Sequence, residues 1–415
     1  MPETLARHIK VLSGWAFPSD GFDELEGLPL IRIRDLASGT TEVKFKGSYD
    51  PRYVIDDGDV LIGMDGDFSV EKWAGGPALL NQRVCKVETA SENLDQGFLY
   101  WYLMPHVAEI HRKTPQTTVR HLAASSLGHI VAPPISVAEQ RTVNEILDTL
   151  DTTIRQTEAI IEKLKQVKQG LLHDLLTRGI DANGELRPPQ SQAPHLYKDS
   201  PLGWIPWEWE AITLGAAVGR SGGAIQTGPF GSQLHAHEYV PEGVPVIMPQ
   251  DILDGAIDRA QIAMVSDRKA IAMARHQVAT NDVVFSRRGD LSRCAAIGEH
   301  EIGWLCGTGC LLVRLPKTEL LGVWLSLVYR QPLVQAQVLG RAVGSTMANL
   351  NTGILSELHV TRPPVEEQSE IDSRIRALSS TLEAESDLAA KLRLEKSGLM
   401  DDLLTGHVRV TPLLA

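Results

Sequence analysis

The sequence predicts an α+β fold in which two similar globular domains are separated by two long helices that pair as an antiparallel coiled coil. Two observations predict this fold: an internal repeat with an offset of 228 residues, and a heptad pattern of apolar residues that occurs once in each repeat. The length of 415 residues agrees with two domains, because a single core usually stops growing near about 250 to 300 residues.

The internal repeat is clearest near the end of each half, where KQGLLHDLLTRGI at residues 168–180 matches KSGLMDDLLTGHV at residues 396–408. The same offset aligns further pairs: Glu139-Gln140 with Glu367-Gln368, Leu122 with Leu350, and Leu127 with Leu355. Upstream, GLPLIRIRDL resembles GVPVIMPQDI at an offset of 216, and DGDVLIGMDGDFS resembles TNDVVFSRRGDLS at an offset of 223. Loop insertions explain the drift, so each half has the same order of elements.

The globular part of each half is predicted to be mostly β. VPVIMPQDI, DVVFSRR and CLLVRL are short apolar runs with β-branched residues, bounded by Gly, Pro and Asp. Helices are expected near residues 99–104 and 322–331, where LYWYLM and GVWLSLVYRQ supply apolar faces. A mixed α+β domain in each half follows.

Two heptad seams predict the long helices. The first consists of Val143, Leu147, Leu150, Ile154, Thr157, Ile161, Leu164, Lys168, Leu171 and Leu175. The second consists of Ile371, Ile375, Leu378, Leu382, Glu385, Ala389, Leu392, Lys396, Leu399 and Leu403. Steps of four and three sustained over about four heptads are typical of a coiled coil, and two seams in one register favour pairing with each other.

The polar residues of the seams suggest a register. An antiparallel register that places Lys168 opposite Glu385 also sets Thr157 opposite Lys396, so an ion pair between Lys168 and Glu385 would select it. Charged ends more than about 6 Å apart, or parallel helices, would contradict this hypothesis. The alternative is that both side chains reach solvent separately.

Composition limits the class of protein. An apolar share of 43% with 22% charged residues is that of a folded chain. No run of about 18 apolar residues and no signal peptide is evident, so we expect a cytoplasmic protein without membrane contact. Cys306 and Cys310 lack a second ligand pair nearby, so we expect no metal site.

Catalytic motifs of nucleic-acid enzymes are not found in the sequence. It contains no G-x-x-x-x-G-K-[ST] phosphate loop, and its proline pairs read APPI, RPPQ and RPPV instead of the Asp-Pro-Pro-Tyr or Asn-Pro-Pro-Tyr of amino-methyltransferases. A loose nuclease arrangement of carboxylates with a lysine stays open as an alternative. We therefore predict a binding protein, with no catalytic residue and no cofactor-binding residue in this chain.

Local clusters of cations with amide and hydroxyl groups are the candidate DNA contacts, since such side chains bind phosphates and base edges. The net charge of -12 requires such clusters, because phosphates favour Lys and Arg. In the first half the candidates are Arg112, Lys113, Gln116, Thr117, Thr118, Arg120 and His121. In the second half they are Arg287, Arg288, Arg293, Arg341, Ser345, Thr346 and Asn349. The alternative for each is a solvated surface loop.

Several segments resemble the specificity subunits of type I restriction-modification systems. They are TGPFGSQL (227–234), YKDSPLGWIPWEWE (197–210), GSTMANLN (344–351), the Pro-Pro and Glu-Gln entry to each long helix, and LLTRG with LLTGHV. The resemblance covers nearly the whole chain. It implies target recognition domains at residues 1–135 and 204–364, spacer helices at 136–180 and 365–408, and a linker at 181–203.

The resemblance also implies a function and partners. Each recognition domain would read one half of a bipartite, asymmetric site on double-stranded DNA, while the helices set the gap and dock other subunits. Two modification (methyltransferase) subunits would use S-adenosylmethionine, and a restriction (translocase and endonuclease) subunit would use ATP and Mg. The alternatives are a coiled-coil interaction scaffold that does not bind DNA, and a single-chain nuclease or methyltransferase.

Overall fold

The computed structural model describes residues 3–115, 120–253, 255–316, 319–342 and 349–414. The chain divides into two compact units, and each contains part of both long helices. Unit 1 comprises Met1–Ile161 with Glu385–Ala415, and unit 2 comprises Glu162–Ala384. The α+β class is confirmed in both units.

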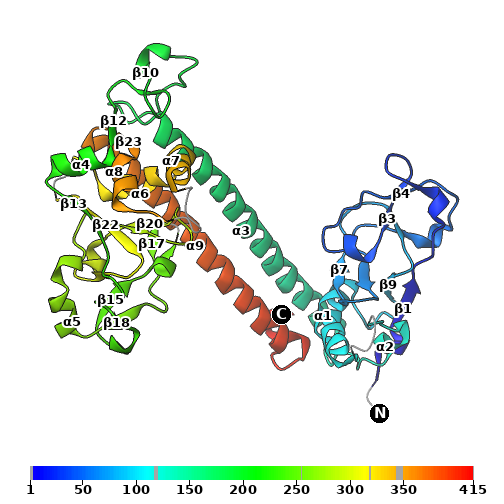
Figure 1. Ribbon diagram of the computed structural model, residues 1–415. Coiled ribbons are helices and arrows are strands. Elements are labelled where there is room, and N and C mark those ends of the chain that lie inside the picture. Colours follow the sequence, from blue (N-terminus) through cyan, green and yellow to red (C-terminus); the bar gives the residue numbers. More distant parts are fainter. Residues whose placement is uncertain (1–2, 116–119, 254, 317–318, 343–348, 415) are drawn as a thin grey trace. The chain divides into compact units, whose positions relative to one another are not determined.

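Unit 1 contains two sheets and, besides its parts of the two long helices, the helices α1 and α2 (Figure 1). Its strands are β1 (Ile9–Ser13), β2 (Phe22–Asp23), β3 (Leu28–Ile31), β4 (Lys44–Phe45), β5 (Val54–Ile55), β6 (Val60–Gly63), β7 (Val70–Lys72), β8 (Ala78–Leu80) and β9 (Val84–Thr89). Its helices are α1 (Gln96–Lys113), α2 (Ala124–Gly128) and the first part of α3 (Val137–Thr177), with 3-10 turns η1 (Leu5–Arg7), η2 (Ser19–Gly21), η3 (Ile33–Asp35), η4 (Pro51–Tyr53) and η10 (Thr411–Leu414).

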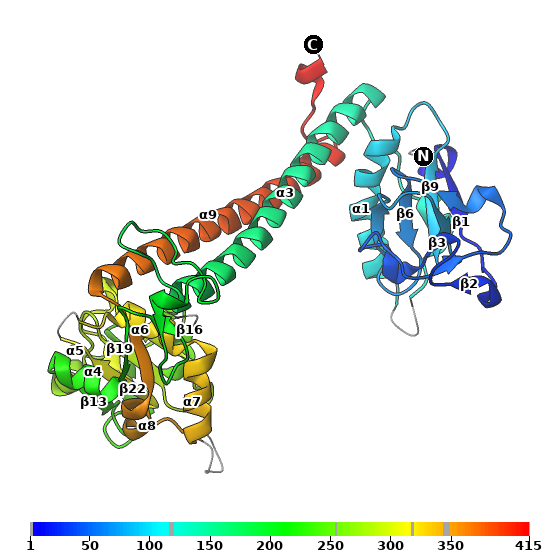
Figure 2. The ribbon, with the colours of Figure 1, turned by 90° about the horizontal axis from the view of Figure 1, so that it is seen from above.

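The central sheet of unit 1 has the order β1-β9-β6-β7 and is antiparallel throughout. The other sheet has the order β2-β4-β3-β8-β5, in which β3 and β8 are parallel. Side-chain alternation along β6 explains the layers: Val60 and Ile62 pack with Phe98 of α1, whereas Leu61 packs with Ile31 of the other sheet. Figure 2 shows α1 on one face of the central sheet.

Unit 2 repeats this arrangement with more elements. Its strands are β10 (Tyr197–Lys198), β11 (Ile205–Pro206), β12 (Glu210–Thr213), β13 (Ala224–Thr227), β14 (Tyr239–Val240), β15 (Val244–Ile247), β16 (Ile252–Leu253), β17 (Ala256–Ile257), β18 (Ala263–Val265), β19 (Val283–Ser286), β20 (Cys294–Ala296), β21 (Leu305–Cys306), β22 (Cys310–Arg314) and β23 (His359–Arg362). Its helices are α4 (Leu214–Ser221), α5 (Asp267–Ala272), α6 (Gly322–Tyr329), α7 (Pro332–Ala342), α8 (Thr352–Glu357) and the first part of α9 (Val365–Leu404). Its 3-10 turns are η5 (Pro194–Leu196), η6 (Ala236–Glu238), η7 (Pro249–Asp251), η8 (Ala274–His276) and η9 (Glu299–Glu301).

The strand order confirms the duplication seen in the sequence. The central sheet of unit 2 has the order β13-β22-β19-β20, which matches β1-β9-β6-β7 strand for strand. In the other sheet β15 and β21 are parallel, as β3 and β8 are in unit 1. The segments matched at offsets of 216 and 223 form β3 with β15 and β6 with β19, so the weaker sequence matches are structural equivalents.

The predicted seams are the least exposed rows of α3 and α9. No seam residue is exposed; Val143, Leu147, Ile154, Thr157, Ile161, Leu175, Ile371, Ile375, Ala389 and Leu403 are buried, and the other ten are half-buried. Within unit 1 the two helices run antiparallel, because Asp151 pairs with Lys396 while the later Glu158 pairs with the earlier Arg393. Lys396, which the predicted register set opposite Thr157, thus has Asp151 as its ion-pair partner. Lys168 and Glu385 belong to different units, so their pairing stays a prediction.

The Glu-Gln pair fixes the start of each long helix. The Gln140 side chain donates to the carbonyl of Ile135 and accepts from the amide of Asp95, and Gln368 does the same with Pro363 and Leu321. Both glutamines are almost fully buried, and a buried polar group left without a partner costs about 1 to 3 kcal/mol. The equivalent contacts explain why these residues recur in both repeats.

The glutamate of each Glu-Gln pair binds an arginine from the segment that follows the other long helix. In unit 1, Arg409, which follows α9, donates to both carboxylate oxygens of Glu139 at 2.8 and 2.6 Å. In unit 2, Arg187, which follows α3, pairs with Glu367, and Trp209 Nε1 donates to the same carboxylate at 3.0 Å. In each unit, an arginine-glutamate pair therefore connects the start of one long helix to the segment that follows the other long helix.

Candidate nucleic-acid interface

In each unit, several chain segments meet at one edge of the central sheet. Because β1 and β6 are both antiparallel to β9, they end at the same edge, where β9 begins. The same holds for β13, β19 and β22 in unit 2. At this edge a tight turn joins β6 to β7, or β19 to β20, and it pairs with a residue that follows α1 or α7.

The edge of unit 2 brings three candidate residues together. Arg288 forms a backbone bridge with Asn349, and the Arg287 Nε donates to the Asn349 side-chain oxygen at 3.1 Å. The backbone then continues the pairing, since the Leu350 amide donates to the Arg287 carbonyl at 3.0 Å. The Arg288 side chain is exposed and has no hydrogen-bond or ion-pair partner among the residues that the structure describes, so its guanidinium is available to a ligand.

Arg293 lies beside this turn and, unlike Arg288, has partners among the described residues. Its guanidinium donates to the Pro249 carbonyl at 3.2 Å and pairs with Asp290 at 3.4 Å. The hydroxyl and amide of Ser292, together with Arg293, lower the pKa of Asp290, so this carboxylate stays ionised. Arg341 is held elsewhere, because it pairs with Glu357 at 3.6 Å from the end of α7.

The edge of unit 1 has the same backbone frame, that is, the turn after the second strand bridged to the segment after the helix, but its side chains differ. Asp65 forms the backbone bridge with His121 and accepts from the His121 ring at 2.6 Å, while Arg83 pairs with the same carboxylate. The offset of 228 takes His121 to Asn349, and the offset of 223 takes Asp65 to Arg288. Equivalent positions thus carry an acid with an arginine and a histidine in unit 1, and in unit 2 an arginine that has no partner among the described residues.

Of the remaining described candidates of unit 1, Arg120 contacts this turn directly, and Arg112 and Lys113 lie in the last turn of α1. Arg120 lies 2.7 Å from the ring nitrogen of His111, and its carbonyl accepts from the amide of Gly66 in the turn. Its buried Nε has no partner in the described part of the chain. Arg112 and Lys113, in the last turn of α1, both pair with Glu109 and are largely exposed. Their charges are therefore partly neutralised but accessible.

Five candidates lie outside the described residues: Gln116, Thr117, Thr118, Ser345 and Thr346. Asp65 and Arg83 were not among the residues predicted from the sequence, because both lie outside its cation-rich segments. The alignment of MDGDFS with RRGDLS was the signal that could have found Asp65, since it places Asp65 on Arg288.

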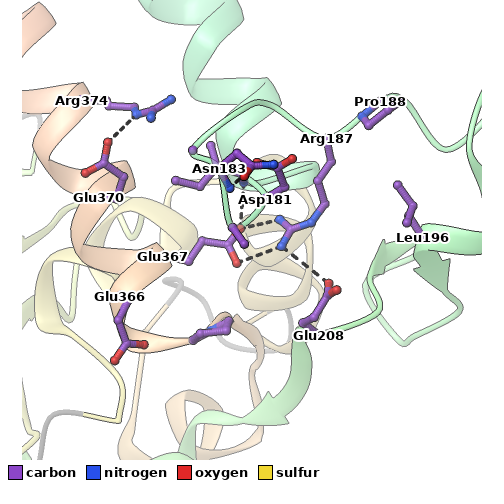
Figure 3. A pocket seen from close by; sticks show the side chains of 14 residues that line it. Asp181, Asn183, Arg187, Pro188, Leu196, Glu208, Glu366, Glu367, Glu370 and Arg374 are labelled. Atoms are coloured by element: carbon purple, nitrogen blue, oxygen red, sulfur yellow. Dashed lines mark hydrogen bonds and ion pairs between the residues drawn. The ribbon is translucent and has the colours of Figure 1, made fainter.

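A cavity of about 750 Å³ in unit 2 has the wrong charge for DNA (Figure 3). It lies between the segment after α3 and the start of α9, where Arg187 faces Glu367 and Glu208. Its charged lining residues are Asp181, Arg187, Glu208, Glu366, Glu367, Glu370 and Arg374. With more carboxylates than cations, the cavity disfavours phosphate.

The cysteines of the CGTGC segment are core residues. Cys306 and Cys310 are both buried, and the Cys310 thiol donates to the Ile247 carbonyl at 3.4 Å. A hydrogen bond with Cys306 and burial raise the pKa of Cys310 well above its ordinary value, so the thiol stays protonated. The described residues contain no group of three or more His, Cys, Asp or Glu side chains that could hold a metal ion. None of the helices in the described ranges is long and apolar enough to cross a membrane.

Two α+β units have the same strand order in their central sheets, and each contains part of both long helices. They define a protein built by internal duplication. The chain belongs to the type I restriction modification DNA specificity domain family, whose model matches residues 9–166 and 267–394.

Individual relatives agree with this assignment. The chain is 27% identical over 376 residues to the type I restriction enzyme EcoBI specificity subunit of Escherichia coli, covering 89% of this chain and 77% of that protein. It is 22% identical over 405 residues to the MjaVIII specificity subunit of Methanocaldococcus jannaschii, covering 94% and 88%. The crystal structure of a type I restriction-modification system S subunit from M. genitalium shares the fold, with a TM-score of 0.60, 16% identity and coverage of 97% and 96%.

Proposed function

We propose that this chain is the DNA specificity subunit of a type I restriction-modification complex, in which each unit reads one half of a split target. The observation that carries this proposal is the pair of sheet edges, which share a backbone frame but differ in side chains. Asp65 and His121 stand in unit 1 where Arg288 and Asn349 stand in unit 2. Because side chains select bases, two different edges select two different sequences, so the site is asymmetric.

The long helices set the gap between the two half-sites and bind the other subunits. The names of relatives such as the EcoBI specificity subunit support this role, since a specificity subunit is one part of a larger enzyme. Two modification subunits would bring S-adenosylmethionine, and a restriction subunit would bring ATP and Mg. This chain has no catalytic role in the proposal and holds no cofactor.

The acidic balance of the chain fits a subunit that binds DNA together with others. A net charge of -12 opposes binding to a polyanion, so the cations at the two edges have to act locally. Partner subunits that close around the duplex would supply further positive charge. The same acidity favours the rival function, a scaffold that binds only proteins.

Duplex binding at several salt concentrations, measured with the modification subunits present, separates the two functions. The proposal predicts that the logarithm of the affinity falls steeply and linearly with the logarithm of salt concentration, because phosphate contacts release counterions. A flat dependence, or no binding, would support the scaffold. Methyltransferase or nuclease activity of the purified chain alone would contradict the proposal in favour of a single-chain enzyme.

A further inference from the structure

An aromatic pocket of about 400 Å³ opens on the surface of unit 1. Trp15 and Tyr53 stack in it with ring centroids 5.8 Å apart, and Tyr49 contributes a third ring to the lining. Trp15 is 42% exposed and Tyr49 is 36% exposed. Exposed aromatic rings that line one pocket offer apolar surface to a ligand, and covering such surface gains roughly 25 cal/mol for each Å².

The guanidinium of Arg52 lies against one of these rings, that of Tyr53. The Arg52 guanidinium lies 4.7 Å from the centroid of the Tyr53 ring and donates to the Tyr53 hydroxyl at 2.9 Å. It also pairs with Asp50 at 3.1 Å, yet its side chain is 63% exposed. The pocket therefore combines flat apolar surface with a guanidinium that is oriented but still accessible.

The pocket adjoins the candidate nucleic-acid interface. Trp15 lies two residues after the end of β1, its amide donates to the Leu80 carbonyl at 3.0 Å, and it forms a backbone bridge with Asn81. Two residues after Asn81, Arg83 pairs with Asp65 of the interface. Trp15 and Asp65 are thus connected through one short turn at the sheet edge where β1 and β6 end.

The glycine that precedes Trp15 has an equivalent in unit 2, with the same backbone hydrogen bond and the same close packing. The Gly14 amide donates to the Val84 carbonyl at 2.9 Å, and the Gly228 amide donates to the Cys310 carbonyl at the same distance. A Cβ at either glycine would lie 2.1 Å from a carbonyl oxygen of the neighbouring turn. Phe230, two residues after Gly228, is 57% exposed. Both units therefore present an exposed ring at this end of the edge.

We propose that the pocket of Trp15, Tyr53 and Arg52 is a further DNA-contact site that extends the interface of the first unit. The inference rests on the proposed function. Its occupant is the target duplex: the exposed Trp15 ring makes apolar contact with a base edge or deoxyribose, and Arg52 binds a backbone phosphate. Phe230 has the role of Trp15 in the second unit.

The test uses the full chain assembled with modification subunits, and compares Trp15→Ala and Arg52→Gln with Trp207→Ala. Trp207 is a matched control, because it is 62% exposed and lies in the segment before β12. We expect Trp15→Ala to weaken binding of the target duplex about tenfold without changing the salt slope. Arg52→Gln should reduce the salt slope by about one, and Trp207→Ala should bind as the parent does.

Photocrosslinking of the unmodified chain to duplexes carrying 5-iodouracil at successive positions gives a readout that does not depend on a variant's folding. A crosslink at Trp15 is expected, and Trp15→Phe should retain most of the affinity. The proposal is overturned if the parent binds with a steep salt slope while Trp15→Ala and Arg52→Gln match Trp207→Ala and no crosslink reaches Trp15. If the parent itself shows no salt-dependent binding, the proposed function has failed instead.

Discussion

Single residues at the two sheet edges carry the difference between the units. Asp65 and Arg288 occupy equivalent turns, followed in each case by a glycine with positive φ, Gly66 at 70° and Gly289 at 76°. A shared backbone allows the side chain to change without rebuilding the turn. The carboxylate of unit 1 pairs with Arg83 and contacts the His121 ring, whereas the guanidinium of unit 2 has no partner among the described residues.

Replacement of Arg288 tests its role in DNA binding. We expect Arg288→Gln to weaken duplex binding by the assembled complex and to reduce the salt slope by about one, because one phosphate contact is lost. Arg376→Gln is the control, since Arg376 is a similarly exposed cation on α9 and pairs with Asp372. Equal binding by the two variants at all salt concentrations would exclude Arg288 as a contact.

The buried Glu139 predicts a dependence of stability on pH. Hydrogen bonds from Arg409 and Thr411, with others from Ser136, lower the pKa of Glu139 below its ordinary value of 4.5. A carboxylate with a lowered pKa stabilises the fold above the ordinary pKa and loses this effect as the pH falls. Glu139→Gln should therefore lower the melting temperature at pH 7, and the difference from the parent should shrink below about pH 4.5.

The exposed Glu145 on the same helix provides the comparison for that experiment. Glu145→Gln should leave the melting temperature nearly unchanged at both pH values, since surface substitutions usually change stability by less than about 0.5 kcal/mol. A Glu139→Gln deficit that stays constant down to pH 3 would show that the charge of this carboxylate is not what stabilises unit 1.

At the residue scale, the cations of the two edges could be predicted from the sequence, but the residues that lie next to them could not. Arg287, Arg288 and Asn349 could be selected because they lie in polar, cation-bearing segments, and the structure brings them together. Asp65 and Trp15 could not be selected in this way, because their positions depend on which strands end at the same edge. That information comes from strand pairing between distant segments, which side-chain type alone does not encode.

At the scale of elements, the long helices were the most predictable part of the fold. Their seams repeat every 3.5 residues over many turns, and such a pattern has few alternative explanations. The ion pairs were not predictable in the same way. Lys396 pairs with Asp151, a half-buried residue outside the seam, and its ammonium also lies 4.7 Å from the centroid of the Trp101 ring, a contact that only the tertiary structure reveals.

Charge reversal at this contact tests how α9 is held in unit 1. The side chains of Lys396 and Asp151 are 19% and 23% exposed, so the loss of one partner should cost about 2 kcal/mol, less than the 3 to 5 kcal/mol of a fully buried pair. Lys396→Asp should lower stability by at least that amount in denaturant unfolding, because it also places two carboxylates side by side, and adding Asp151→Lys should recover part of the loss.

An exposed ion pair on the same helix shows the contrast. Arg376→Asp breaks its pair with Asp372, where the arginine is 67% exposed, and should cost about 0.5 kcal/mol or less. If the Lys396→Asp and Arg376→Asp variants lose the same stability, or if the double reversal recovers nothing, the Lys396–Asp151 contact does not contribute to the helix pairing.

At the scale of the whole molecule, the proposed spacer role predicts how the gap depends on helix length. Duplication of residues 161–167 in α3 and of residues 382–388 in α9 adds one heptad to both helices and keeps both seams. Seven helical residues span about 10 Å, which equals about three base pairs of duplex. We therefore expect the gap between the half-sites to grow by about three base pairs, as mapped by methylation of host DNA.

A change in the half-sites themselves, with the gap unaltered, would contradict the spacer role. An insertion of seven residues in only one helix should instead destroy the pairing and abolish methylation, because the two seams would no longer match in length. This second variant distinguishes a spacer made by both helices from one made by either helix alone.

The central claim is that each unit reads one half of the target independently. The most direct test replaces residues 1–135 with the corresponding domain of another specificity subunit and maps the methylated adenines in host DNA. The account predicts that one half of the recognised sequence changes while the other half and the gap are preserved. A change in both halves, or in neither, would contradict it.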